Sequence, residues 1–157
     1  MIDNIDRKIL SIVQANGRIT NAEIARQIEM APSAVLERMR RLEERGVIKD
    51  YTAVLDSKKL ELGLLAFVFI RADEREDVLT EADLTAEELA ALPGVLEVHH
   101  IAGEDCFMLK LRAQDTEDLY RVMKEDFGKI KSIRSSRTCI VLKTVKETSR
   151  LPIEITH

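Results

Sequence analysis

Residues 21–52, NAEIARQIEMAPSAVLERMRRLEERGVIKDYT, decide the fold of the first half of the chain. Two segments of this stretch place apolar residues at helical spacing on one face, which predicts two short helices that share a core. The apolar positions are Ile24, Ala25 and Ile28 in the first segment and Val35, Met39 and Leu42 in the second. Pro32 disfavours helical geometry for the residue before it, so a turn is predicted at residues 29–32. Gly46 ends the second helix in a left-handed conformation, and a strand is expected after it.

A third helix is predicted upstream, at residues 3–16, because isoleucines recur there at spacings of three and four. Asn16-Gly17 ends this helix. Asn21 is expected to cap the helix that follows, since its side-chain oxygen can accept a backbone N–H. Three helices of this size followed by a strand predict a winged helix-turn-helix, which makes DNA the first partner to consider.

After a linker at residues 57–63, the second half alternates between strands and helices. The expected strands are residues 64–70, 95–102, 106–112 and 133–145. One helix carries Leu84, Leu89 and Leu92 and stops at Pro93-Gly94. Another is capped by Asp115 or Thr116 and buries Leu119, Val122, Met123 and Phe127.

This order of strand, helix, strand, strand, helix, strand predicts a ferredoxin-like split βαβ arrangement, with helices on one face of an antiparallel sheet. The uncovered face is then the expected dimerisation surface, because one protomer cannot bury it alone. The predicted fold class is α+β, with an N-terminal winged helix-turn-helix and its linker at residues 1–62 and a ferredoxin-like βαββαβ domain at residues 63–157.

The composition is that of a soluble globular protein, with 45% hydrophobic and 33% charged residues. No run of about 18 apolar residues could span a membrane, and the start has no export leader, so a cytoplasmic protein is expected. Cys106 and Cys139 lie far apart, outside any metal-ligand spacing, and are expected to be reduced thiols. His99 and His100 are adjacent and would face opposite sides of a strand. We therefore expect no metal and no cofactor.

The net charge of −4 is unevenly divided along the chain. Residues 1–62 carry 11 Lys/Arg and 10 Asp/Glu, whereas residues 63–157 carry 13 and 18. Residues 33–49 contain five basic and three acidic side chains. Affinity for DNA from phosphate contacts grows with the number of cations delivered, so one head of this charge should bind weakly. We therefore expect that a dimer or a larger assembly is needed to bind well.

The exposed start of the second motif helix would enter the major groove, because that end points at base edges in helix-turn-helix proteins. Its base-facing candidates are Ser33, Ala34, Glu37 and Arg38. Candidates for holding phosphates, or for pairing with Glu37 and Glu44 along the helix, are Arg40, Arg41 and Arg45. Further candidates for backbone contact are Lys49, Tyr51, Thr20 and Asn21, although Tyr51 could equally pack on the core. The alternative is that these charges only solvate a surface.

Several segments, in one order, resemble the leucine-responsive regulatory protein and AsnC family, the feast/famine transcriptional regulators of bacteria and archaea. They are IDRKIL (5–10), NGRITNAEIA (16–25), VLERMRRLEERGVIKDYTAVLD (35–56), AGEDCFMLKL (102–111) and SSRTCIVLKTVKET (135–148). The resemblance implies an N-terminal winged head, a linker strand and a C-terminal domain for ligand sensing and oligomerisation. It also implies assembly as homodimers and often as homo-octamers.

The resemblance further implies a small effector, usually an amino acid, that binds between dimers beside the turn Gly103, Glu104, Asp105 and Cys106. Thr138 and Ile140 of a facing protomer would line the same pocket. Many members have a glycine followed by two spaced acidic residues here, whereas this chain has adjacent acids and Cys106 in the later place. From the residues alone, N–H groups around Gly103 could hold a carboxylate and an acid could hold an ammonium group. The turn could instead be a tight hairpin that needs glycine for its geometry.

Together these features predict a sequence-specific DNA-binding transcriptional regulator whose assembly responds to a small effector. Its expected partners are double-stranded DNA, an amino acid and further copies of itself, and not a membrane. The alternative is an architectural DNA-compacting protein that needs no effector. An enzyme is not expected, because the sequence offers no nucleophile beside a base, no phosphate-binding loop and no metal cluster.

Overall fold

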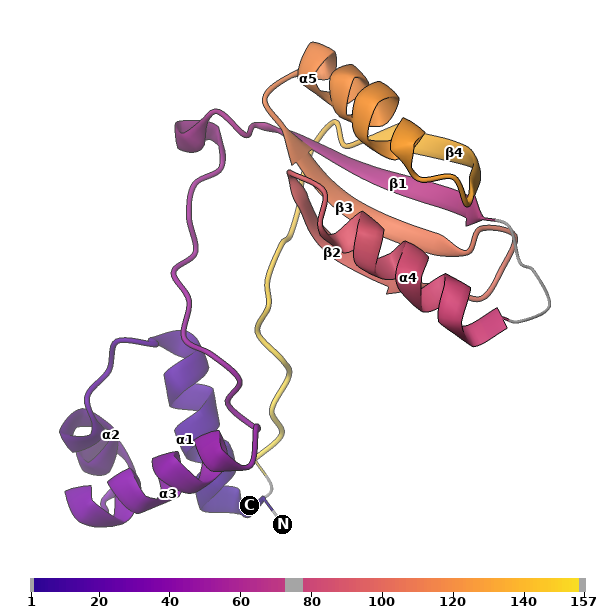
Figure 1. Cartoon of the computed structure of the whole chain (residues 1–157). Coiled ribbons are helices and arrows are strands. Elements are labelled where there is room, and N and C mark those ends of the chain that lie inside the picture. The colour runs from indigo at the N-terminus through magenta and orange to yellow at the C-terminus, as the bar shows by residue number, and fades with distance from the viewer. Residues whose placement is uncertain (1, 73–77, 156–157) are drawn as a thin grey trace. The chain divides into compact units, whose positions relative to one another are not determined.

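The computed structural model describes residues 2–72 and 78–155, with the backbone alone for residues 78–83. The chain forms two compact units (Figure 1). A helical unit contains Met1–Val54 and Lys146–His157, and a sheet unit contains Leu55–Val145. The chain therefore passes between the units twice, once in each direction.

Three helices make the helical unit: α1 (Asn4–Ala15), α2 (Asn21–Ile28) and α3 (Pro32–Glu44). Their shared core contains the buried side chains of Ile9, Ile24, Ala25, Val35, Met39 and Leu42. The apolar positions predicted for α2 and α3 all belong to this core or, for Ile28, pack against it. The predicted helical periodicity and shared core are confirmed, because each amphipathic face is stable only against another apolar face.

The caps of α1 and α2 explain where each helix begins. Asp3 and Asp6 form a reciprocal pair at α1, in which each carboxylate accepts the backbone N–H of the other residue. Thr20 and Glu23 do the same at α2. The prediction that Asn21 caps α2 is wrong, because Asn21 is already inside the helix. The Thr-x-x-Glu spacing satisfies two backbone N–H groups at once, which favours Thr20 as the cap.

The turn between α2 and α3 lies where the proline predicted it. Glu29 adopts a left-handed conformation with φ of 56°, and α3 begins at Pro32. Gly46 has a φ of 65° and follows the end of α3 as expected. The strand predicted after Gly46 is wrong, since residues 47–56 contain no strand. A strand needs a neighbour that takes its backbone N–H and C=O groups, and a local apolar pattern does not provide one.

The C-terminal segment, residues 146–157, belongs to the helical unit. Gln14 of α1 bonds to both backbone groups of Leu151, and Arg150 donates to the carbonyl oxygen of Ala15 at 3.2 Å. Residues 55–62, which include a 3-10 helix at Lys58–Leu60, lie instead with the sheet unit. The compact units thus differ from a division at 62/63, because contacts through backbone groups leave no periodic pattern in a sequence.

The sheet unit has the predicted order of strands and helices. It contains β1 (Leu64–Ala72), α4 (Val78–Ala90), β2 (Val95–His100), β3 (Phe107–Ala113), α5 (Thr116–Arg121) and β4 (Ile133–Ile140). The strands pair antiparallel in the order β2-β3-β1-β4, so the ferredoxin-like arrangement is confirmed. β4 is shorter than the predicted 133–145. Val141 N–H still reaches Leu65 O at 2.8 Å, but β1 begins at Leu64 and the pairing ends there.

The helix after β3 is longer and less regular than a single α-helix. Asp115 caps α5 and accepts two backbone N–H groups, both at 2.9 Å. The chain then continues through a π-helical turn, Val122–Asp126, and a 3-10 helix, Phe127–Lys129. The buried face predicted for this segment is confirmed, with Leu119, Val122 and Phe127 in the core and Met123 packed against it.

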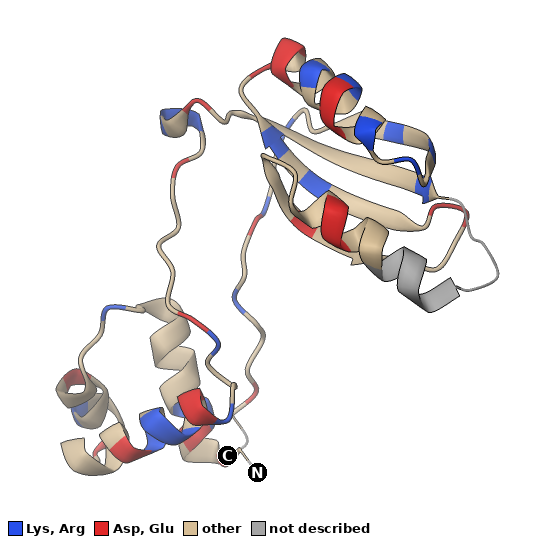
Figure 2. Ribbon diagram, viewed as in Figure 1, with Lys and Arg blue, Asp and Glu red and all other residues tan. Residues whose placement is uncertain are grey.

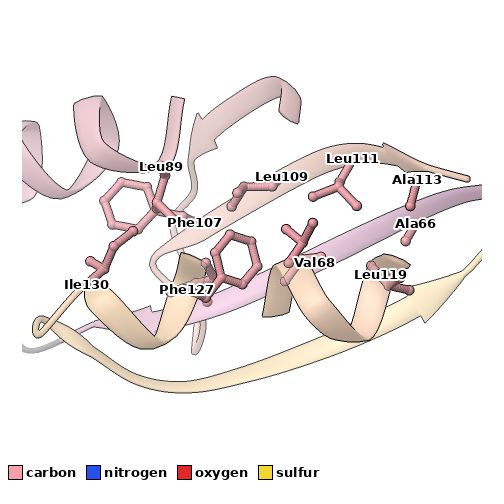
Figure 3. Packing of buried hydrophobic residues seen from close by; sticks show 12 residues of the cluster. Ala66, Val68, Leu89, Phe107, Leu109, Leu111, Ala113, Leu119, Phe127 and Ile130 are labelled. Carbon is pink, nitrogen blue, oxygen red and sulfur yellow. The ribbon is translucent and has the colours of Figure 1, made fainter. Parts of the chain in front are cut away.

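Both α4 and α5 cover one face of the sheet, and the core lies between them and the strands (Figure 3). The inward residues alternate along the two central strands: Ala66, Val68 and Ile70 on β1, and Phe107, Leu109, Leu111 and Ala113 on β3. On α4, Leu89 is buried as predicted, but Leu84 is 60% exposed. Thr85 takes the inward position instead, with its hydroxyl 2.9 Å from Ser132 Oγ. The hydroxyl pair lets a polar residue occupy this part of the core.

Candidate DNA-binding and effector sites

One face of α3 is exposed and carries most of the residues predicted to meet DNA. The exposed residues are Ser33, Leu36, Glu37, Arg40, Arg41 and Glu44. Figure 2 shows basic and acidic segments along this helix. Leu36 is 57% exposed and was not among the predicted contacts. The signal for it was its position between the core residues Val35 and Met39, off the apolar face.

The start of α3 differs from the start of α2. No side chain caps α3, its first turn has no acidic residue, and Pro32 occupies its first position. At α2 the Thr20 hydroxyl donates to Glu23 Oε2 at 2.7 Å, so the cap is closed by its own carboxylate. Because a helix N-terminus attracts anions, α3 offers an open positive end to a phosphate and α2 offers a neutralised one.

The arginines on the exposed face of α3 pair along their own helix, as predicted. Arg40 lies 3.5 Å from Glu37 and 3.6 Å from Glu44, and Arg41 lies 3.6 Å from Glu37. The two arginine side chains are 62% and 58% exposed. Exposed pairs of this kind contribute about 0–1 kcal/mol, so either arginine can turn to a phosphate at little cost. Arg45 and Lys49 follow on the exposed surface after the helix.

Arg38 is placed differently from the other predicted base-facing residues. Its side chain is only 21% exposed, and its Nη1 donates to Asp3 and to Asp6, both at 2.7 Å. The N–H of Asp6 and then Arg38 lower the pKa of Asp3. The two carboxylates in turn raise the pKa of Arg38, Asp3 more than Asp6. The guanidinium is therefore directed toward α1, and Ala34 is also only partly exposed.

Tyr51 packs on the helical unit. Its hydroxyl donates to Glu43 Oε1 at 2.8 Å, and its ring lies near Gly17. Partial burial of the phenol, followed by the bond to Glu43 and the charge of that carboxylate, raises the pKa of Tyr51 to about 12. Of the two alternatives for this residue, the structure shows contact with the protein.

The turn predicted to hold an effector connects β2 to β3. Gly103 has a φ of 156°, and Gly103 and Glu104 are exposed. Ile101 N–H bonds to Cys106 O at 2.9 Å, and Cys106 N–H bonds to Ile70 O at 2.8 Å. These bonds fix the turn beside the end of β1, where its acidic side chains meet residues of two strands.

Two arginines that were not predicted from the sequence engage both acids of this turn. Arg71 donates to Glu104 O at 3.0 Å and to its carboxylate at 3.3 Å. Arg137 donates to Asp105 at 3.0 Å, and its guanidinium carbon lies 4.2 Å from the ring centre of Phe69. Asp105 is the main cause of the raised pKa of Arg137. Two guanidinium groups beside a glycine turn can hold a carboxylate in paired hydrogen bonds.

Thr138 and Ile140 face the other side of the sheet from this pair of arginines. Thr138 lies opposite the inward residue Val68 on β1, and its hydroxyl donates to the sulfur of Met123 at 3.9 Å. Ile140 lies opposite Ala66, which is also inward. Residues of one strand alternate between faces, so a single protomer does not bring Thr138 or Ile140 to the turn at Gly103.

The histidines and cysteines lie apart from both candidate sites. His100 stacks on Phe107 with ring centres 5.0 Å apart, while His99 meets Glu97 at 3.3 Å on the other face, as predicted. Cys106 is partly buried and Cys139 is exposed, and both are free thiols. Within residues 2–72 and 78–155, no group of three His, Cys, Asp or Glu side chains could hold a metal ion. No helix in the described part of the chain has the length and apolar character to cross a membrane.

Comparisons with known proteins match both units. Residues 2–49 match the family described as winged helix-turn-helix DNA-binding, and residues 65–151 match the family described as Lrp/AsnC ligand binding domain. The HTH-type transcriptional regulator FL11 of Pyrococcus horikoshii is 36% identical, over 98% of this chain and 97% of that protein. The leucine-responsive regulatory protein of Escherichia coli is 33% identical, over 98% of this chain and 92% of that protein. A crystal structure of a Neisseria meningitidis transcriptional regulator with L-Met has a TM-score of 0.88 and 29% identity, covering 97% of each chain.

Proposed function

Because the chain belongs to the Lrp/AsnC family of DNA-binding transcriptional regulators, we propose that α3 reads double-stranded DNA and that an amino acid bound to the sheet unit changes the assembly of the protein. The relatives are regulators of transcription, and the chain is not an enzyme. Two surfaces support the proposal: the exposed face of α3 and the turn at Gly103. We infer a cytoplasmic location, where a regulator of this kind has access to DNA.

The observation that carries DNA recognition is the uncapped start of α3 beside a row of exposed polar residues. The proposed contacts to base edges are Ser33, Ala34 and Glu37. The proposed contacts to the phosphate backbone are Arg40, Arg41, Arg45, Lys49, Thr20 and Asn21. Leu36 can add an apolar contact to a thymine methyl group.

An amino-acid effector is supported by the L-Met complex of the Neisseria meningitidis relative. The proposed effector site contains Gly103, Glu104, Asp105 and Cys106 of one protomer, with Thr138 and Ile140 supplied by another. Because Arg71 and Arg137 already lie at the turn, they are the natural partners for the carboxylate of an amino acid. A site between dimers couples ligand binding to assembly, since only the assembled form presents the whole pocket.

We infer a homodimer and a homo-octamer as the assembled forms. The face of the sheet opposite α4 and α5 presents Phe67 and Phe69 half-buried in a single chain. A second protomer would remove this apolar surface from water. Assembly would also deliver several heads to one duplex, which offsets the modest charge of each.

The test of DNA recognition is the affinity for a duplex that the wild-type protein selects from random DNA. Arg40→Ala and Arg41→Ala should each weaken binding and reduce the slope of log affinity against log salt by about 0.9 per lost phosphate contact. Arg121→Ala, which removes an exposed arginine from the sheet unit, is the matched control and should change neither. Unchanged affinity in all three variants would refute the placement of the DNA surface on α3.

The test of effector binding is a light-scattering titration with each standard amino acid. A change of assembly state with one of them, L-methionine first, is the expected result. Gly103→Arg should block that change and leave DNA affinity intact, because the added side chain occupies the turn in a φ of 156° that glycine favours. A full response in this variant would exclude the turn as the site.

A second candidate function is architectural DNA compaction without an effector. The observation that favours it is that both acids of the turn already have arginine partners within the chain, Arg71 for Glu104 and Arg137 for Asp105. An amino acid would have to displace these pairs to use its ammonium group there. Assembly and DNA binding that stay unchanged across all twenty amino acids would decide for this function.

A further inference from the structure

Asp3, Asp6 and Arg38 form a closed cluster at the start of α1. Each carboxylate uses one oxygen for the backbone N–H of the other residue, at 2.8 and 3.2 Å, and its second oxygen for Arg38. Both bonds from Arg38 Nη1 are 2.7 Å long. All four carboxylate oxygens are therefore engaged, and one atom of α3 is held by two residues of α1.

This cluster is placed to control how α3 is rotated about its own axis. Successive side chains of a helix are about 100° apart, so holding Arg38 toward α1 turns Glu37 and Arg41 toward solvent. The side chains of Arg38 and Asp6 are 21% and 11% exposed, whereas those of Arg41 and Glu37 are 58% and 51% exposed. The core residues of α3 limit large rotations, and the bridge fixes the remaining freedom on its flank.

The bridge is not easily exchanged for a DNA phosphate. The pairs of Arg40 and Arg41 are longer and exposed, so they cost little to break. Arg38 makes shorter bonds, one of them to the mostly buried carboxylate of Asp6. Removing Arg38 to a phosphate would leave that carboxylate buried without its counter-charge, which is far more costly than breaking a surface pair.

We propose that Arg38 is a positioning residue for DNA recognition, and that the Asp3–Asp6 pair is the anchor that sets the angle at which α3 presents its exposed face to base edges. The inference rests on the proposed function of α3 as the reading helix. A small error in this angle moves side chains off the base edges, while contacts to the backbone, which carry no sequence information, persist. Two acidic residues of a DNA-binding head thereby support specificity.

The decisive variant is Asp6→Asn, because charge and positioning predict opposite results. Removing one negative charge should strengthen binding to every duplex by general electrostatics. Loss of positioning should weaken binding to the duplex selected by the wild-type protein and reduce its preference over an unselected duplex. We expect this affinity ratio to fall about tenfold, the size of one lost base contact, when anisotropy titrations are run far below the melting temperature.

The matched control is Glu29→Gln, which removes one exposed carboxylate from the same unit. It should leave the ratio of the two affinities unchanged. Asp3→Asn repeats the test at a carboxylate that is 52% exposed, so it applies even if circular dichroism shows that Asp6→Asn does not fold. A lowered ratio in either folded aspartate variant supports the positioning role.

Arg38→Gln separates positioning from direct contact with DNA. Loss of a phosphate contact would reduce the salt slope by about 0.9 and add to the effect of Asp6→Asn. Loss of positioning should leave the slope for the unselected duplex unchanged, and the double variant should bind no worse than either single variant. Additive losses with a reduced slope would overturn the proposal.

The outcomes also separate this inference from the function on which it rests. A wild-type protein that binds no duplex at low salt would refute DNA reading by α3. A wild-type protein with a clear preference, together with an Asp6→Asn variant that keeps the ratio or gains affinity for both duplexes, would overturn the positioning role alone.

Discussion

Gln14 and Leu151 are joined by two hydrogen bonds in opposite directions. The side-chain oxygen of Gln14 accepts the Leu151 N–H at 2.7 Å, and its side-chain nitrogen donates to Leu151 O at 3.1 Å. The amide thereby satisfies both backbone groups of a residue that lies 137 positions away in the chain. Arg150 adds a bond to Ala15 O at the end of α1, where a cation is favourable.

Gln14→Ala should therefore destabilise the helical unit. Two exposed hydrogen bonds are lost, so the free energy of unfolding should fall by about 0.5–1 kcal/mol, and the Leu151 amide should exchange with solvent faster. Native-state hydrogen exchange measures both quantities. Gln27→Ala, at an exposed position of α2, is the control, and an equal change in the two variants would show that the bonds to Leu151 contribute nothing.

Gly94 should tolerate no side chain. Its φ is 77°, and an added Cβ would collide with the carbonyl oxygen of Arg112, a residue whose N–H bonds to Gly94 O at 2.8 Å. Gly94→Ala should lower the free energy of unfolding of the sheet unit by about 1–3 kcal/mol in a denaturant titration. Gly128→Ala, where the added carbon meets no atom within 4 Å, should cost less. Equal stability of both variants would contradict the close approach of the two strands.

Tyr51 should ionise late in an alkaline titration followed by ultraviolet absorbance. Its pKa is raised from 10.0 to about 12, so its contribution to stability is present below pH 10 and is lost as the pH rises toward 12. Tyr51→Phe should remove this late-ionising phenol and flatten the loss of stability in that range. A titration in which both tyrosines ionise together near pH 10 would contradict the bond to Glu43.

Asp3 should make the helical unit sensitive to acid. Its pKa is lowered from 3.8, mainly by the N–H of Asp6 and then by Arg38. The stabilisation is thus present above pH 3.8 and is lost as the pH falls through the lowered pKa. Asp3→Asn should reduce the fall in the melting temperature of the unit over that range. An acid curve identical to that of the wild-type protein would argue against the bridge to Arg38.

The parts of the fold that could be predicted are those written as local periodicity. Val35, Met39 and Leu42 recur at helical spacing, and each is buried. Phe107, Leu109 and Leu111 alternate along β3, and each faces the core. Burial of one apolar face stabilises such elements more than any other interaction, so the pattern that achieves it is strong in the sequence.

The parts that failed depend on competition between neighbours. Thr20 and Asn21 are both good caps, and the geometry of Glu23 decides between them. Leu84 and Thr85 are adjacent, and the position of Ser132 on a distant segment lets the polar residue turn inward. The strand expected after Gly46 required a partner that local sequence cannot supply.

The candidate sites divide in the same way. The exposed positions Ser33, Glu37 and Arg41 follow from helix geometry alone. The inward direction of Arg38 follows from carboxylates 35 and 32 residues away, which no local pattern reveals. Arg71 and Arg137 meet the turn for a similar reason, because strand pairing brings three distant segments together.

The split composition of the helical unit has a consequence for protein synthesis. Residues 4–44 leave the ribosome first and can form their three helices early. Leu151, which seals α1, is translated only after every strand of the sheet has been made. The two modules must therefore mature in an interleaved schedule, and a stall between them would leave a nascent chain whose first helix lacks its final backbone partner.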